Sequence, residues 1–159
     1  TLFRSPVGNK GLVIEKVDGP NHIKVVEEFG YEMYLHCGAI RKVLLAYQSP
    51  SFIEEYVKKI IEHDHAFPRV DAGDLRDELK RIRQSGYAIT YGEYVNDAVG
   101  IGAPVFNSEG ELAGSIGIIA PTIRLNSEEL LKVQLEYVQK FAADLSRDIG
   151  YSPLFSSRA

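Results

Sequence analysis

The residues with the most direct potential for chemistry are His36 and Cys37, which immediately precede a run of helical periodicity. Unpaired N–H groups at a helix start, together with the helix dipole, could lower the pKa of a thiol or hold an anion. A thiolate nucleophile also needs an oriented base, and no acid or amide is placed by the sequence to orient His36. The alternatives are an anion-binding floor made by Gly38, Ala39 and Ile40, or a helix cap beside a small buried thiol.

The sequence gives weaker support for the other candidate catalytic or metal-binding groups. Glu93 and Asp97 flank a loop and could form a carboxylate pair for acid–base work, or could be solvated loop charges. His63 and His65 would lie about 200° apart around a helix axis, so they would not converge on one metal ion. The sequence contains no GxSxG, Walker, HExxH or CxxC motif. We therefore expect no metal, no cofactor and no enzymatic activity.

Composition restricts the possible partners. The 159 residues are 45% hydrophobic and 25% charged, which is ordinary for one globular domain. The formal net charge of −4 offers no broad positive field for a phosphate backbone, so we expect no direct nucleic-acid binding by this chain. No apolar run is long enough to span a bilayer. The single cysteine, Cys37, suits a reducing cytoplasm, so we expect a soluble cytoplasmic domain with no membrane contact.

The first half of the chain predicts a hairpin, a strand and three helices. Two apolar runs, 1–7 and 12–17, flank turn-forming residues, and a third strand is predicted at 22–29. Helical spacing begins near 36 and continues to 47. Ser49 and Pro50 predict the start of a second helix that ends near 63–65, and Asp71 and Gly86 predict the start and end of a third.

The second half predicts three strands followed by one long helix. The strands are expected at 87–93, 98–106 and 112–121. Asn126 with Glu129 matches a capping box, Leu125 with Leu130 a hydrophobic staple, and Gly150 ends the helix. Because the helices are grouped and do not alternate with every strand, the order predicts an α+β fold with a mainly antiparallel sheet.

Glycines are frequent in the later strands. Glycine inside a strand marks a bulge or a close approach, so Gly100, Gly102 and Gly117 predict a hollow between neighbouring strands. Equally, these glycines could only make room for the first helix or a neighbouring strand. The sequence leaves both interpretations open.

Four runs of residues, in order, resemble successive motifs of the C-terminal domain of IclR-type transcriptional regulators. They are GLVIEKVDGP (11–20), LHCGAIRKVLLA (35–46), RQSGYA (83–88) and GAPVFN (102–107). The resemblance implies a GAF-like or profilin-like α+β domain, with a central, mainly antiparallel sheet flanked by helices, over 1–151, followed by a tail at 152–159. It also implies binding of a small metabolite, often a carboxylate, and homodimers or tetramers. DNA would be contacted only through an N-terminal winged helix-turn-helix, which we expect to be absent from this chain.

The same resemblance implies where the ligand lies. Matched motif by motif, the family's pocket positions, with Gly38 at the helix start, fall on Val25, Met33, Gly38, Ala39, Ile40, Thr90, Ala98, Gly100, Gly117 and Ile119. The chain departs from the family at several of them. Family members often have Asp at Thr90, Cys at Gly100, Ser at Gly117 and Ile119, and Gly at Arg41.

These departures remove polar groups that would hold a small, strongly hydrated acid such as glyoxylate. We therefore expect a larger, more apolar effector, such as an aromatic or alkyl carboxylic acid. Its polar end would lie near Gly38, Ala39 and Ile40, with Arg41 close by. The effector would favour one oligomer arrangement over another. Two alternatives remain: a small enzyme using Cys37 with His36, or Glu93, and a dimerisation module without a ligand.

Overall fold

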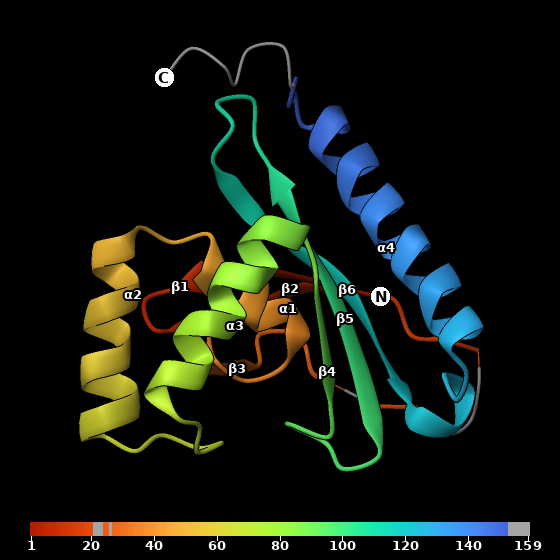
Figure 1. Cartoon of the computed structure of the whole chain (residues 1–159). Helices are drawn as coiled ribbons and strands as arrows, with labels where there is room; N and C mark the ends of the chain where they lie inside the picture. Colours follow the sequence, from red (N-terminus) through yellow and green to blue (C-terminus); the bar gives the residue numbers. More distant parts are fainter. Residues whose placement is uncertain (21–23, 26, 153–159) are drawn as a thin grey trace.

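The computed structural model describes residues 1–20, 24–25 and 27–152. Within them, six strands form one antiparallel sheet in the order β3-β2-β1-β6-β5-β4. Their bounds are β1 Leu2–Val7, β2 Lys10–Lys16, β3 Glu32–Tyr34, β4 Ala88–Tyr91, β5 Ala98–Phe106 and β6 Leu112–Pro121. The sheet is curled, because β1, β2 and β3 turn away from the direction of β4, β5 and β6 (Figure 1). The predicted α+β fold with an antiparallel sheet is confirmed.

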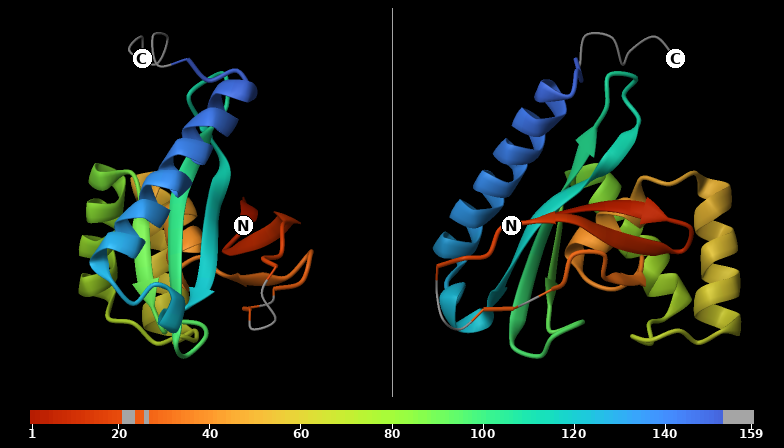
Figure 2. Two further views of the ribbon diagram at one scale, coloured as in Figure 1. Left: turned by 90° about the vertical axis from the view of Figure 1, so that its right-hand side faces the viewer. Right: turned by 180° about the vertical axis from the view of Figure 1, so that it is seen from behind.

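Strand β5 is covered on both faces. Helix α1 (Ala39–Ala46) packs on one face of the sheet and helix α4 (Glu128–Asp148) on the other (Figure 2). Residues 98–105 of β5 are all buried as a result. A strand buried on both sides is expected to be apolar throughout and not alternating, which is how residues 98–106 read in the sequence.

The remaining helices form a layer beside α1. Helix α2 (Pro50–Tyr56) continues directly into a π-helix, η1 (Val57–His63), and α3 (Ala72–Ser85) packs against α1. A short 3-10 helix, η2 (Thr122–Arg124), links β6 to α4. The predicted caps at Ser49, Asp71 and Gly86 are confirmed: Ser49 Oγ accepts from the Phe52 N–H, and Gly86 has a φ of 76°. None of the described helices combines the length and apolar composition needed to cross a bilayer.

Two glycines let α1 approach the sheet closely. A Cβ at Gly102 would lie 2.8 Å from the Cα of Ile40, and a Cβ at Gly117 only 2.1 Å from the carbonyl oxygen of Ile101 and 2.5 Å from Cγ1 of Ile40. The sequence left open whether these glycines line a hollow or make room for the first helix. Gly102 and Gly117 make room for the helix. Gly100 has more room than these two glycines. A Cβ there would lie 3.1 Å from Thr90 Oγ1, 3.5 Å from Ala39 Cβ and 3.7 Å from the backbone nitrogen of Ala39.

The predicted third strand at 22–29 is wrong for the residues that can be described. Lys24, Val25 and residues 27–29 belong to no strand, and residues 22, 23 and 26 lie outside the described part of the chain. The third strand is β3, which pairs with β2. The physical reason is that Glu27 is drawn into the interior by Arg4 and Arg41, an interaction that the spacing of apolar residues does not reveal.

The predicted start of the long helix is wrong by one residue. Ser127, and not Asn126, is the N-cap of α4, and its Oγ accepts a hydrogen bond from the Leu130 N–H at 3.2 Å. The capping box and the staple both depended on Asn126 as the cap, so neither pattern applies. Leu130 is accordingly 45% exposed.

Candidate functional site

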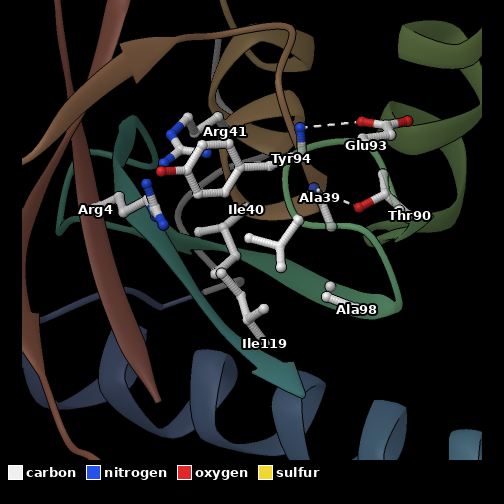
Figure 3. A pocket seen from close by; sticks show the side chains of 13 residues that line it. Arg4, Ala39, Ile40, Arg41, Thr90, Glu93, Tyr94, Ala98 and Ile119 are labelled. Carbon is white, nitrogen blue, oxygen red and sulfur yellow. Dashed lines mark hydrogen bonds between the residues drawn. The ribbon is translucent and has the colours of Figure 1, made fainter. Parts of the chain in front are cut away.

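A cavity lies between the start of α1, the loop after β4, and strands β1, β5 and β6. We call it the α1 cavity; its volume is about 30 Å³, about that of one water molecule, and it is partly open to solvent. Seven residues from the sequence-based set line it, and several are visible in Figure 3: Gly38, Ala39, Ile40, Thr90, Ala98, Gly100 and Ile119. They come from α1, β4, β5 and β6, so the fold brings together segments that are far apart in the sequence.

Three residues of the set do not line this cavity. Val25 lines a neighbouring cavity, which it shares with Ile119. Met33 lies on β3, paired with Gly11 of β2. Gly117 faces Ile40 so closely that no space remains beside it. The motif comparison therefore selected segments that meet at one cavity, but it did not in every segment select a residue that lines the cavity.

Sequence reasoning did not assign two groups of lining residues to the ligand site, although it considered Glu93 as a catalytic carboxylate. The loop after β4 contributes Gly92, Glu93, Tyr94 and Val95, and β1 contributes Arg4; Arg41, already suspected, also lines the cavity. One signal could have found Arg4. It shares the inward-facing side of β1 with Leu2, where an apolar residue is expected.

The first N–H groups of α1 already have partners inside the protein. Glu93 Oε2 accepts from the Gly38 N–H at 3.0 Å, and Thr90 Oγ1 accepts from the Ala39 N–H at 3.0 Å (Figure 3). Glu93 also pairs with Lys42, which is buried. Gly38, Ala39 and Ile40 thus form part of the cavity wall, as expected, but the amides of Gly38 and Ala39 point to protein oxygens.

A charged cluster is buried beside the cavity. Arg4, Glu27 and Arg41 are 1%, 4% and 2% exposed. Glu27 pairs with Arg4 through Oε2 and with Arg41 Nη2 through Oε1, the latter at 3.0 Å. Burial, and secondarily the nearby Arg41 charge, lower the pKa of Arg4 to about 9, which still leaves it protonated at neutral pH. The cluster therefore holds two positive charges and one negative charge.

Tyr94 covers part of this cluster. The guanidinium carbon of Arg41 lies 5.4 Å from the centre of the Tyr94 ring, and the Tyr94 hydroxyl donates to the Tyr31 hydroxyl at 3.0 Å. Both arginine side chains approach the ring (Figure 3). Tyr94 thereby connects the loop after β4 to the charged cluster.

His36 and Cys37 are arranged as structural residues. Both are 0% exposed, and burial raises the pKa of the Cys37 thiol. The carbonyl of Pro68 can only accept, so the ring Nε2–H of His36 donates to it at 2.9 Å, while Nδ1 accepts from the Tyr56 hydroxyl at 2.8 Å. These contacts leave the imidazole without a free nitrogen to act as a base toward Cys37.

The other candidate groups do not form a reactive site. His63 is 84% exposed and hydrogen-bonded to Asp64, as expected for a solvated helix end. Among the described residues, no group of three His, Cys, Asp or Glu side chains is placed to hold a metal ion. Glu93 is engaged by Lys42 and the Gly38 N–H.

Comparison with known proteins identifies the family. The family described as "Bacterial transcriptional regulator IclR C-terminal" matches residues 4–147. The HTH-type transcriptional regulator KipR of Bacillus subtilis is 29% identical, with 91% of this chain and 58% of that protein covered. The uncharacterised HTH-type transcriptional regulator RhmR of Escherichia coli is 30% identical, with 92% and 56% covered. The chain thus spans slightly more than half the length of these relatives.

Solved structures of IclR-type regulators agree with this family assignment. The IclR protein of Thermotoga maritima superposes with a TM-score of 0.83 at 25% identity, covering 94% of this chain and 61% of that one. The C-terminal domain of a putative transcriptional regulator from Vibrio cholerae superposes with a TM-score of 0.74 at 26% identity, covering 89% and 82%. The chain therefore belongs to the IclR family of bacterial transcriptional regulators and corresponds to its C-terminal, effector-binding domain.

Proposed function

We propose that this chain binds a small organic effector in the α1 cavity and that binding controls DNA recognition by a winged helix-turn-helix in a longer regulator. One observation carries the proposal. Seven of the residues assigned to the effector by resemblance, contributed by four different elements, line one cavity next to the start of α1. Ligand sites of this kind combine apolar walls with a few polar groups that fix orientation.

The lining favours an organic acid with an apolar body. Ile40, Ala98 and Ile119 offer apolar surface, while Arg4 and Arg41 supply positive charge. Thr90, the polar side chain opposite them, already accepts from the Ala39 N–H. A two-carbon acid would leave this apolar wall uncovered, whereas an aromatic or alkyl carboxylic acid would bury its body against the wall. Because the cavity has a volume of only about 30 Å³, such an acid requires the cavity walls to move apart.

Control of DNA binding would follow from a population shift. The cavity is walled by α1 and by the loop after β4, so an occupant contacts both. If one arrangement of a homodimer or tetramer closes these walls better than another, the effector stabilises that arrangement by the difference in its affinities. The attached DNA-reading domains would then change their spacing.

A thermal-shift panel tests binding. Benzoate, phenylacetate, hexanoate, pyruvate and glyoxylate are each titrated against the chain, and at 100 times its Kd a binder should stabilise by about 2.7 kcal/mol. We expect stabilisation by the aromatic or alkyl acids. Tight binding of only the smallest acids would contradict the proposed effector class. No stabilisation by any compound of a broad metabolite panel would favour a dimerisation module without a ligand.

A further inference from the structure

The buried cluster of Arg4, Glu27 and Arg41 carries one unbalanced positive charge. Arg4 pairs with Glu27 Oε2, and Arg41 Nη2 lies 3.0 Å from Glu27 Oε1, so a single carboxylate serves two guanidinium groups. All three residues are at least nine-tenths buried. An uncompensated charge away from water is costly, and proteins therefore pair such charges with a counterion.

The arginines also have unused hydrogen-bond donors. Within the described part of the chain, the donors Arg4 Nε, Arg4 Nη1 and Arg41 Nε are buried without a hydrogen-bond partner, and so is one acceptor, Glu27 Oε2, which contacts Arg4 as an ion pair. Arg41 Nη1 is used, because it donates to the Cys37 carbonyl at 2.9 Å. Buried donors nearly always have a partner in a folded protein, so these three N–H positions require one.

The unused donors belong to residues that line the α1 cavity. Both Arg4 and Arg41 form part of its wall (Figure 3). The other candidate anion site, the start of α1, is not free, because Glu93 and Thr90 accept from its first N–H groups. The positive charge and the unpartnered donors therefore both belong to residues of the cavity wall.

We infer that Arg4 and Arg41 together bind the carboxylate of the effector, and that Glu27 is the internal counterion that holds the two arginines in place before the effector arrives. This inference rests on the proposed function and deepens it. One carboxylate brings the cluster to neutrality and supplies acceptors for the unused N–H groups. The apolar body of the effector then lies against Ile40, Ala98 and Ile119, and a monocarboxylate is preferred over a dicarboxylate.

Calorimetry with paired acids and amides tests the inference. The probes are benzoate and hexanoate against benzamide and hexanamide, which have the same apolar bodies without the charge. In the unaltered chain the acids should bind at least about tenfold tighter than the amides, because hydrogen bonds to charged groups are the stronger ones. In Arg4→Met this preference should disappear, with amide affinity changed by less than about threefold.

Arg4→Met is suited to the test because it leaves a one-to-one Glu27–Arg41 pair, so the fold should be retained. Arg81→Met, on the exposed side of α3, removes the same charge far from the cavity and should leave all four affinities unchanged. Glu27→Gln gives a second readout, because it should raise the affinity for benzoate, whereas Arg4→Met should lower it. Without the internal carboxylate the unliganded protein should be less stable, and benzoate should bind at least about threefold tighter.

The possible failures can be told apart. Amides that bind the unaltered chain as tightly as the acids would overturn the inference and leave the proposed function standing. Inorganic phosphate that binds as tightly as benzoate would overturn the assignment to a carboxylate with an apolar body. An unchanged acid preference in Arg4→Met would exclude Arg4 from the site. If neither the four probes nor any compound in the metabolite panel binds, the proposed function itself is contradicted.

Discussion

At the scale of single residues, Gly117 sets how closely α1 approaches the sheet. It lies on β6 opposite Gly102 of β5, and a Cβ there would be 2.1 Å from the Ile101 carbonyl oxygen. We expect Gly117→Ala to lower the free energy of unfolding by about 2 kcal/mol or more, because overpacking a tight interior forces backbone shifts. Urea denaturation measures the change.

Gly19→Ala is the matched control. A Cβ at Gly19 would have no atom within 4 Å, so the substitution should change stability by less than about 0.5 kcal/mol. Equal effects of the two substitutions would show that the loss at Gly117 comes from the general cost of replacing glycine and not from contact with Ile101 and Ile40.

His36 should make stability depend on pH. Burial, the largest cause, lowers the pKa of its imidazole below the ordinary value of 6.5, with Lys42 acting in the same direction. Below pH 6.5 the unfolded chain therefore takes up a proton that the folded chain does not. The stabilisation from His36 is fully present above pH 6.5 and is lost as the pH falls through the lowered pKa.

The expected size is limited by the pH window. Between pH 6.5 and 5.0 the loss is at most about 2 kcal/mol, since each pKa unit corresponds to about 1.4 kcal/mol. Unfolding free energies at pH 7.5 and 5.0 should differ by more in the unaltered chain than in His36→Gln, which is uncharged at both values. The same difference in both proteins would exclude His36 as the source.

At the scale of elements, the start of α4 can be assigned by experiment. Ser127 Oγ accepts from the Leu130 N–H, whereas Asn126, the cap expected from the sequence, precedes the helix. Ser127→Ala should cost about 1 kcal/mol, the usual loss for an N-cap. Asn126→Ala should cost less than about 0.5 kcal/mol. The reverse order in chemical denaturation would restore Asn126 as the cap.

Elements were predictable where local chemistry decides them. Strands β5 and β6 were expected at 98–106 and 112–121 and lie there, and α3 is bounded by Asp71 and Gly86 as expected. The π-helical form of η1 had no local signal. The third strand was misplaced because Glu27 packs against Arg4 and Arg41, which are distant in sequence. Local patterns do not report such long-range ion pairs.

At the scale of the whole molecule, the cavity was partly predictable. The motifs located α1, β4, β5 and β6, and seven residues of the set meet at one cavity. Arg4 and the loop residue Tyr94 were missed, and Glu93 was considered only as a catalytic carboxylate, because their positions depend on how the sheet curls and where the loop returns. Met33 and Gly117 were included only by position in the motifs, which does not specify the direction of a side chain.

Effector binding should also alter self-association if the proposed population shift operates. In sedimentation velocity, saturating benzoate, or the tightest acid of the panel, should change the association constant of the chain. Reciprocally, the acid should bind with different affinity at low and high protein concentration. Identical sedimentation with and without acid, at proven saturation, would contradict control through oligomer arrangement and leave binding itself unaffected.

The central claim, that an organic acid binds in the α1 cavity, is tested most directly by filling the cavity. Gly100 lies on β5, where a β-branched residue suits the strand; its Cβ would meet Ala39 Cβ at an ordinary 3.5 Å and Thr90 Oγ1 at a tight 3.1 Å. Calorimetry should show that Gly100→Val still unfolds cooperatively, at a somewhat lower temperature because Thr90 must shift, and binds the panel's tightest acid at least about tenfold more weakly. Unchanged affinity in a folded Gly100→Val protein would place the effector elsewhere and contradict the account.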